Sequence, residues 1–310
     1  MKIGVLDIGS NSFHFILGQI DISLNLKILE RNRTVLRLNK FNAQSLNNID
    51  TDDLQKALSI INNAIEICRK HNAELIVVAT SAVRESKNKN EFVNEIQNKL
   101  GIRINVLEGE EEAKLIYLGV TKQLNFSDSE IICNIDIGGG STEIILGLGE
   151  KIIHASSVAV GAVRLASKYF PDYKINDEIF ENAYYDVSLI LEDLKSKSEG
   201  FKPTKFIGSS GTFLAILEII KKNNQLTHDQ NFFNYDMFNQ AKLKIYSCRT
   251  VKERMNINGV EERRADILPA GFIIVDSLFK TFGVEQFYVS TFSLREGVMI
   301  AKYLGKMNFC

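Results

Sequence analysis

Two short stretches of the sequence determine the expected fold: residues 5–12 read VLDIGSNS, and residues 134–141 read NIDIGGGS. Each is an apolar run that ends in Asp-Ile-Gly, followed by a small polar turn and a second apolar run. The second copy begins near the middle of the 310-residue chain. Self-similarity of this kind predicts two domains of like design, each with one glycine-rich β-hairpin.

The segments around the first hairpin alternate between the two kinds of secondary structure. The sequence predicts strands at 2–7, 12–20, 24–30, 74–80 and 103–107, and helices at 51–71, 89–99 and 109–121. Thr51 is the expected N-cap of the first helix, because apolar residues follow it at helical spacing. A mixture of strands and helices in this order is typical of an α/β domain.

A similar order follows the second hairpin. Strands are expected at 130–136, 141–147, 151–157, 204–208 and 285–290, and helices at 161–169, 176–199, 211–222, 235–247, 261–281 and 294–305. We therefore expect one domain at 1–121 and a second at 122–294. The C-terminal helical segment, 295–310, is a candidate to pack on the first domain.

Composition excludes several classes of protein. The chain has 37 Lys and Arg against 38 Asp and Glu, so a general DNA-binding protein with a basic face is not expected. No apolar run reaches membrane-spanning length, and the N-terminus has no signal pattern, so we expect a cytoplasmic protein without membrane contact. None of the four cysteines forms a C-x-x-C pair, and the four histidines are scattered, so no zinc site is expected.

The two hairpin turns have the composition of phosphate-binding loops. Glycine lets the backbone approach a ligand closely, and successive N–H groups in a tight turn bind phosphate oxygens. The Asp that ends the preceding strand would then bind a hydrated Mg²⁺ beside the phosphates. Because the turn joins two strands, it differs from the P-loop, in which the turn opens a helix. The alternative is an ordinary hairpin turn, which the repetition of the motif disfavours.

Longer matching segments extend this pattern over nearly the whole chain. They are DIGSNSFHFI (7–16), ATSAVRESKN (79–88), GEEEAKLIYLGV (109–120), IDIGGGSTEII (135–145), SVAVGAVRL (157–165), IGSSGT (207–212), RRADILPAG (263–271) and LREG (294–297). With them the sequence resembles the Ppx/GppA family of exopolyphosphatases and guanosine pentaphosphate phosphohydrolases, in its short, two-domain form. The resemblance implies two actin-like (ribonuclease H-like) α/β domains with an inter-domain cleft, as in the actin, sugar-kinase and heat-shock chaperone superfamily.

The resemblance also implies roles for individual residues. Glu112 matches the family's catalytic glutamate, and Glu143 matches its second essential carboxylate. Asp136, Glu143 and Asp7 are the expected ligands of Mg²⁺. The expected phosphate-binding residues are Asp7, Gly9, Ser10, Asn11, Ser12, Arg84, Gly138, Gly139, Gly140, Ser141, Ser210, Gly211 and Thr212.

Several of these residues have alternative interpretations. Glu110 and Glu111 are expected to be solvated at a helix start, where negative charge suits the helix dipole. Arg84 could instead form a local salt bridge with Glu85 or Glu108. The segment 209–212 could be a simple helix N-cap, and Arg164 and Arg264 are as consistent with pinning helices as with contacting substrate.

The first functional hypothesis is a Mg²⁺-dependent exopolyphosphatase that releases terminal orthophosphate from inorganic polyphosphate. The second is a guanosine pentaphosphate 5′-phosphohydrolase of the stringent response. A sugar or acetate kinase would share the loops, but no matching acceptor signature is present. A non-catalytic, nucleotide-binding actin-like protein would need the loops but not Glu112 and Glu143. A homodimer is left open.

Overall fold

The structure is a computed structural model of the whole chain. It describes residues 1–38, 48–124, 126–172, 174–197, 202–224, 227, 229–307 and 309. The predicted helix at 176–199 and the predicted segment 295–310 thus end in residues outside this description. By its internal contacts the chain divides into unit 1, Met1–Lys122 with Phe292–Cys310, and unit 2, Gln123–Thr291.

Unit 1 is built on a five-stranded sheet with the order β3-β2-β1-β4-β5. Its strands are β1 (Lys2–Ile8), β2 (Ser12–Ile20), β3 (Leu26–Val35), β4 (Glu74–Ala79) and β5 (Ile104–Val106). β1, β2 and β3 form an antiparallel meander, whereas β4 and β5 run parallel to β1. The turn between β1 and β2 therefore lies at the same sheet edge as the carboxyl end of β4.

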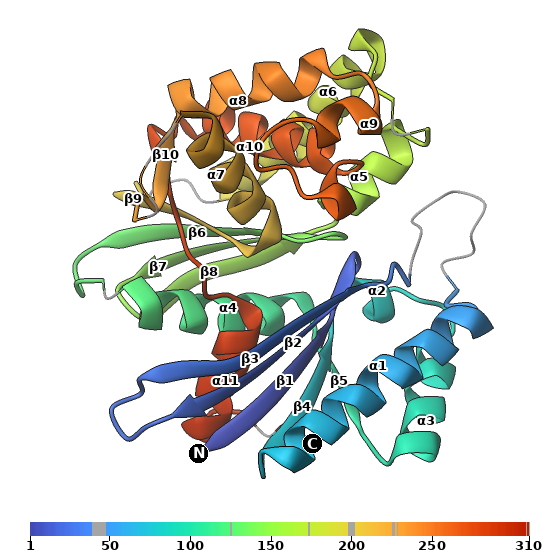
Figure 1. Cartoon of the computed structure of the whole chain (residues 1–310). Helices are drawn as coiled ribbons and strands as arrows, with labels where there is room; N and C mark the ends of the chain where they lie inside the picture. The colour runs from blue at the N-terminus through green and yellow to red at the C-terminus, as the bar shows by residue number, and fades with distance from the viewer. Residues whose placement is uncertain are drawn as a thin grey trace. The chain divides into compact units, whose positions relative to one another are not determined.

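Helices cover both faces of this sheet (Figure 1). α1 (Thr51–Lys70) and α3 (Lys89–Leu100) pack on the face that contains Leu6 and Ile8, and α2 (Ser81–Arg84) follows β4 directly. α4 (Gly109–Leu124) and α11 (Leu294–Tyr303) lie on the other face. Gly119 and Gly297 bring these two helices into backbone contact, because a Cβ on Gly297 would lie 1.8 Å from the carbonyl oxygen of Leu115.

Unit 2 is built on a six-stranded sheet with the order β10-β11-β9-β6-β7-β8. Its strands are β6 (Ile131–Ile137), β7 (Thr142–Leu148), β8 (Lys151–Val158), β9 (Lys205–Ser209), β10 (Phe232–Asn234) and β11 (Gln286–Val289). The first three again form an antiparallel meander, and β9 and β11 run parallel to β6. Apart from the added edge strand β10, this is the topology of unit 1.

The helices of unit 2 gather around one almost completely buried helix, α10 (Leu268–Phe282). They are α5 (Ala162–Tyr169), α6 (Asp177–Lys197), α7 (Ser210–Asn224), α8 (Tyr235–Ser247) and α9 (Val251–Met255), with a 3₁₀ turn, η1 (Glu262–Arg264). Aromatic rings of Phe233, Phe238, Phe279 and Phe287 meet between α10, α8 and the sheet. Such rings bury a large apolar area and stabilise the packing of α10 and α8 on the sheet.

Most predicted elements are confirmed, and the exceptions have local causes. The predicted helix at 261–281 is wrong as a single element: η1 and α10 are separate, because Pro269 marks a new helix start near Leu268. Thr51 is not the N-cap of α1. Asp50 is, since its side chain accepts a hydrogen bond from the backbone N–H of Asp53 at 2.8 Å.

Among the described residues, none of the helices has both the length and the apolar character that crossing a membrane requires.

Candidate active site

The hairpin between β1 and β2 is closed by a hydrogen bond from the Gly9 N–H to the Ser12 carbonyl, 3.2 Å long. Its polar side chains are bonded within unit 1. The hydroxyls of Ser10 and Ser81 lie 2.9 Å apart, and Arg37 donates through Nε to the Asn11 side-chain oxygen at 2.8 Å. This turn is therefore held by its side chains, and its backbone is the part best suited to meet a phosphate.

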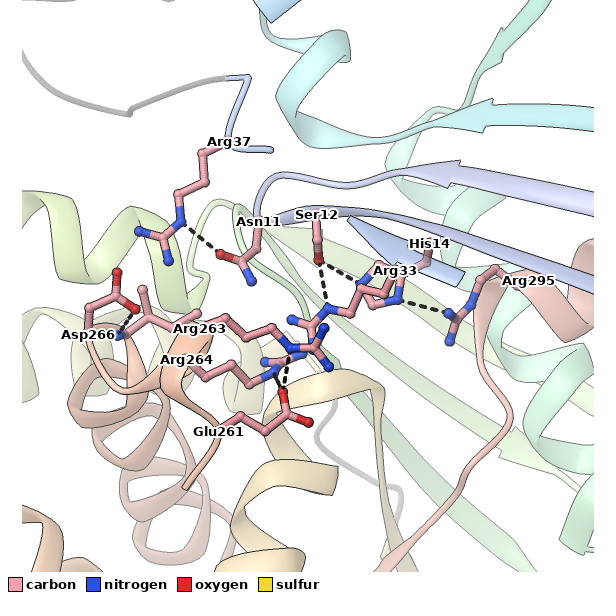
Figure 2. A network of polar contacts seen from close by, with 11 residues as sticks. Asn11, Ser12, His14, Arg33, Arg37, Glu261, Arg263, Arg264, Asp266 and Arg295 are labelled. Carbon is pink, nitrogen blue, oxygen red and sulfur yellow. Dashed lines mark hydrogen bonds and ion pairs between the residues drawn. The ribbon is translucent and has the colours of Figure 1, made fainter. Parts of the chain in front are cut away.

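A polar network surrounds the start of β2 (Figure 2). Ser12 Oγ lies 2.7 Å from His14 Nε2, and Arg33 Nε donates to the same oxygen at 3.2 Å. Arg295 Nη1 lies 3.0 Å from His14 Nδ1. Since a guanidinium can only donate, Nδ1 accepts, and the neutral ring donates from Nε2 to Ser12. The sequence analysis placed neither His14 nor these arginines in the site.

The hairpin between β6 and β7 closes in the same way, by a 3.0 Å hydrogen bond from the Gly138 N–H to the Ser141 carbonyl. The start of α5 then bonds the carbonyl groups of the turn. Ala162 N–H donates to Gly138 O at 3.0 Å and Val163 N–H to Gly139 O at 2.8 Å.

The Arg164 side chain completes this arrangement by donating through Nε to Gly140 O at 2.7 Å. N–H and C=O point in opposite directions across a trans peptide. With the carbonyls of residues 138–140 turned toward α5 and Arg164, the N–H groups of Gly139, Gly140 and Ser141 face the other side of the loop. Arg164 thus ties the start of α5 to this loop.

Two carboxylates stand opposite each other where this hairpin begins. Asp136 and Glu143 are cross-strand partners on β6 and β7, so their side chains share one face of the sheet. They are only 4% and 1% exposed. Ser209 Oγ donates to Asp136 Oδ2 at 2.7 Å, and Ser157 Oγ donates to Glu143 Oε1 at 2.7 Å. The hydroxyl groups orient the carboxylates without neutralising their charge.

Glu112 lies in the first turn of α4 and is buried, with 6% exposure. Its Oε2 accepts from Arg84 Nη1 at 2.9 Å, and the same Nη1 donates to the Leu107 carbonyl at 2.8 Å. Two residues that the sequence placed in the site therefore bind each other. Glu110 and Glu111 are exposed, as predicted for a solvated helix start.

The N-terminus of α7 directly follows Ser209. Ser210 has a left-handed φ of 72°, a strained conformation for a residue with a Cβ atom. Thr212 Oγ1 donates to the Ile137 carbonyl at 3.0 Å, which ties α7 to the end of β6. Gly211 lies under the guanidinium of Arg264: a Cβ on Gly211 would be 1.8 Å from Arg264 Nη2. Arg264, for which the sequence left helix pinning and substrate contact equally open, is therefore a candidate site residue at the start of α7.

The site residues form two groups, one in each unit. In unit 1, the Ser10–Ser81 contact links the first loop to α2, which contains Arg84, the partner of Glu112. In unit 2, the second loop adjoins Asp136, Glu143 and the start of α7. In the part of the chain that the structure describes, no three His, Cys, Asp or Glu side chains gather as a metal-binding cluster. Of the three expected metal ligands, Asp136 and Glu143 are cross-strand partners in unit 2, whereas Asp7 belongs to unit 1.

Comparison with known sequences agrees with this geometry. The sequence model of the Ppx/GppA phosphatase family matches residues 18–305. The chain belongs to the Ppx/GppA phosphatase family. A Haemophilus influenzae protein provisionally named an exopolyphosphatase is 28% identical over 302 residues, which are 96% of this chain and 90% of that protein. The chain is accordingly a hydrolase of phosphoric anhydrides.

Solved structures of family members share the fold. An exopolyphosphatase from Cytophaga hutchinsonii is 27% identical, with a TM-score of 0.86 and 98% of each chain covered. The Ppx/GppA family member of Aquifex aeolicus is 24% identical, with a TM-score of 0.81 and 99% of each chain covered. The predicted fold class, two actin-like α/β domains, is confirmed by these structures and by the repeated sheet topology.

Proposed function

We propose that this Ppx/GppA family member is a Mg²⁺-dependent exopolyphosphatase that releases terminal orthophosphate from inorganic polyphosphate. The observation that most supports it is the second hairpin. Three N–H groups (Gly139, Gly140, Ser141) face one side of the loop, and a pair of buried carboxylates stands at its base. An anion-binding backbone beside acidic side chains is the arrangement that a metal-bound phosphate chain requires.

Phosphate binding is assigned to backbone groups and guanidinium groups. The turns at 9–12 and 138–141 offer N–H groups to phosphate oxygens. The N-terminus of α7 at 210–212 offers further N–H groups, and Arg264 lies directly on it. Arginine binds phosphate through paired hydrogen bonds, which a lysine cannot make.

The unit 2 carboxylates fit a magnesium ion. Asp136 and Glu143 provide oxygen ligands on one sheet face, and Mg²⁺ binds one or two carboxylates while keeping several waters. We assign these two residues to the ion and propose Asp7 of unit 1 as a further ligand. When bound, the ion would neutralise negative charge on the phosphate oxygens.

Glu112 is the proposed general base or the residue that orients the attacking water. Arg84 holds the Glu112 carboxylate in one position through Nη1. A guanidinium has five N–H donors, so Arg84 can bind a substrate phosphate while it holds Glu112. The Arg84–Glu112 ion pair therefore supports both phosphate binding by Arg84 and orientation of the attacking water by Glu112.

The decisive experiment measures orthophosphate release from polyphosphates of graded length and from guanosine pentaphosphate, with Mg²⁺ and after chelation. We expect turnover of polyphosphate that disappears with chelation and returns with Mg²⁺. Preferential turnover of guanosine pentaphosphate would support the second family activity instead. Full activity after thorough chelation would contradict the metal assignment.

A further inference from the structure

Arg254 is a completely buried arginine on the short helix α9, with 0% exposure. Burial lowers the pKa of its guanidinium, while nearby acidic groups, of which Asp266 is the strongest, oppose the shift. Burying a charged side chain costs free energy unless strong hydrogen bonds compensate it. The position of Arg254 therefore calls for a specific role.

The hydrogen bonds of Arg254 connect two separate stretches of backbone. Nε donates to the Ala265 carbonyl at 2.7 Å, and Nη1 donates to the Cys248 carbonyl at 3.2 Å. Ala265 follows η1 immediately, so the first bond fixes the turn that contains Arg264. The second anchors that turn to the segment between α8 and α9.

The Arg264 guanidinium lies where the dipole of α7 opposes a positive charge. It lies on Gly211, the second residue of α7, where the helix dipole presents positive potential. Its ion pair with Glu261 is long, 3.6 Å from Nε to Oε2, and the carboxylate is 45% exposed (Figure 2). A pair of this length, with its carboxylate nearly half exposed to water, makes only a modest contribution to the position of Arg264.

We propose that Arg254 is a positioning residue for substrate binding: it fixes the 261–267 turn so that the Arg264 guanidinium lies over the start of α7. This inference rests on the proposed function, in which Arg264 and residues 210–212 bind phosphate. Arg254 itself touches no substrate and acts through Arg264. A guanidinium and helix N–H groups held together before binding lose less entropy when a phosphate arrives.

The test is Arg254→Lys, which keeps the charge but cannot donate to both carbonyls in the same geometry. We expect KM for polyphosphate to rise on the order of tenfold, the loss typical of a weakened charge-assisted hydrogen bond, with kcat nearly unchanged. In an Arg264→Gln background the same substitution should not change KM further, because Arg254 acts only through the Arg264 guanidinium and this variant lacks it. Arg249→Lys, which alters only an exposed pair with Asp177, is the matched control.

A purely structural Arg254 would lower the unfolding temperature and leave KM unchanged, and that result would overturn the proposal. Equal rises in KM with and without Arg264 would also overturn it. KM does not depend on the folded fraction, so a poorly stable variant still gives an answer. Gly211→Ala is a second variant: α7 tolerates alanine, but its methyl group must displace the Arg264 guanidinium, and the same KM rise is expected.

The dissociation constant for inorganic tripolyphosphate, measured by calorimetry, separates this inference from the proposed function. Wild-type protein that binds tripolyphosphate without releasing phosphate would contradict the enzyme assignment alone. Arg254→Lys should still weaken that binding. Unchanged tripolyphosphate binding in Arg254→Lys would remove the positioning role whatever the catalytic activity.

Discussion

The hairpins of the two units have the same backbone hydrogen bond but differ in the charged groups around them. Each turn closes with a hydrogen bond from a Gly N–H to a Ser carbonyl, Gly9 to Ser12 and Gly138 to Ser141. Each preceding strand presents an Asp with a cross-strand partner. That partner is His14 opposite Asp7 in unit 1, but Glu143 opposite Asp136 in unit 2.

This single difference divides the chemistry between the units. In unit 1, His14 is bonded to Arg295 and shares Ser12 with Arg33, so cationic groups surround the turn. In unit 2, two buried carboxylates occupy the corresponding face. In the proposed function, the repeated backbone would therefore provide two phosphate loops, the first for an anion and the second for an anion together with its metal ion.

The largest expected effect is that of Glu112→Gln, which tests whether unit 1 supplies the base while unit 2 supplies the metal ligands. Loss of a general base typically lowers kcat by a factor on the order of 10² to 10⁴. The affinity for polyphosphate should survive, because the loops are unchanged. Single-turnover kinetics and a binding titration measure the two quantities.

Glu111→Gln is the control, because Glu111 is exposed on the same helical turn. An equal loss of kcat in Glu111→Gln, or normal turnover in Glu112→Gln, would show that Glu112 is the wrong carboxylate.

Glu143→His makes the second hairpin resemble the first. We expect the Mg²⁺ concentration for half-maximal activity to rise by about 10- to 100-fold or more, because one oxygen ligand is replaced by a neutral ring. Activity titrated with Mg²⁺ measures this shift. The exposed Glu150, in the turn between β7 and β8, provides the control, Glu150→His. An unchanged Mg²⁺ requirement would remove Glu143 from the metal site.

The reverse exchange, His14→Glu, puts a carboxylate beside the first turn. Its charge should repel a polyanion and raise KM roughly tenfold, equivalent to about 1.4 kcal/mol, with less effect at high salt. KM measured over a range of ionic strength distinguishes this from misfolding. His154→Glu, at an exposed position of β8, should leave KM unchanged. A salt-independent effect would argue against an electrostatic role for the first hairpin.

The smallest effect is expected for Ser157→Ala, which removes the hydroxyl that orients Glu143. The loss of one such hydrogen bond, about 0.5–1.5 kcal/mol, should weaken Mg²⁺ activation roughly two- to tenfold. Ser156→Ala is the adjacent control, since Ser156 Oγ makes only a 3.5 Å contact with the Ile144 carbonyl. Equal effects of the two substitutions would mean that the hydroxyl on Glu143 has no special role.

The hairpins could be predicted from sequence because their determinants are local. A buried strand, Asp-Ile-Gly and a small polar turn specify the backbone within a few residues. The regular helices followed from apolar periodicity, as in α1. β10 and α9 could not be predicted, because three to five residues show no reliable period.

The contacts between distant residues in the candidate site were beyond sequence reasoning. Arg84 was expected to pair with Glu85 or Glu108 if it made a salt bridge, but it forms its salt bridge with Glu112. Arg254 lies in a short polar segment that resembles a surface helix, yet it is fully buried. Partners that come together only in the folded chain leave no signal in local composition.

Unit 1 consists of two parts separated by the whole of unit 2. Its last helix, α11, packs against β1 and β2, and Met299 lies on Gly18. On the ribosome, unit 2 is therefore synthesised completely before α11. Domains usually fold in order from the N-terminus, at about 5–20 residues per second. At this rate the synthesis of unit 2 takes on the order of ten seconds, and during that time one face of the unit 1 sheet lacks its covering helix. Unit 1 begins the chain and is nevertheless the last unit to be completed.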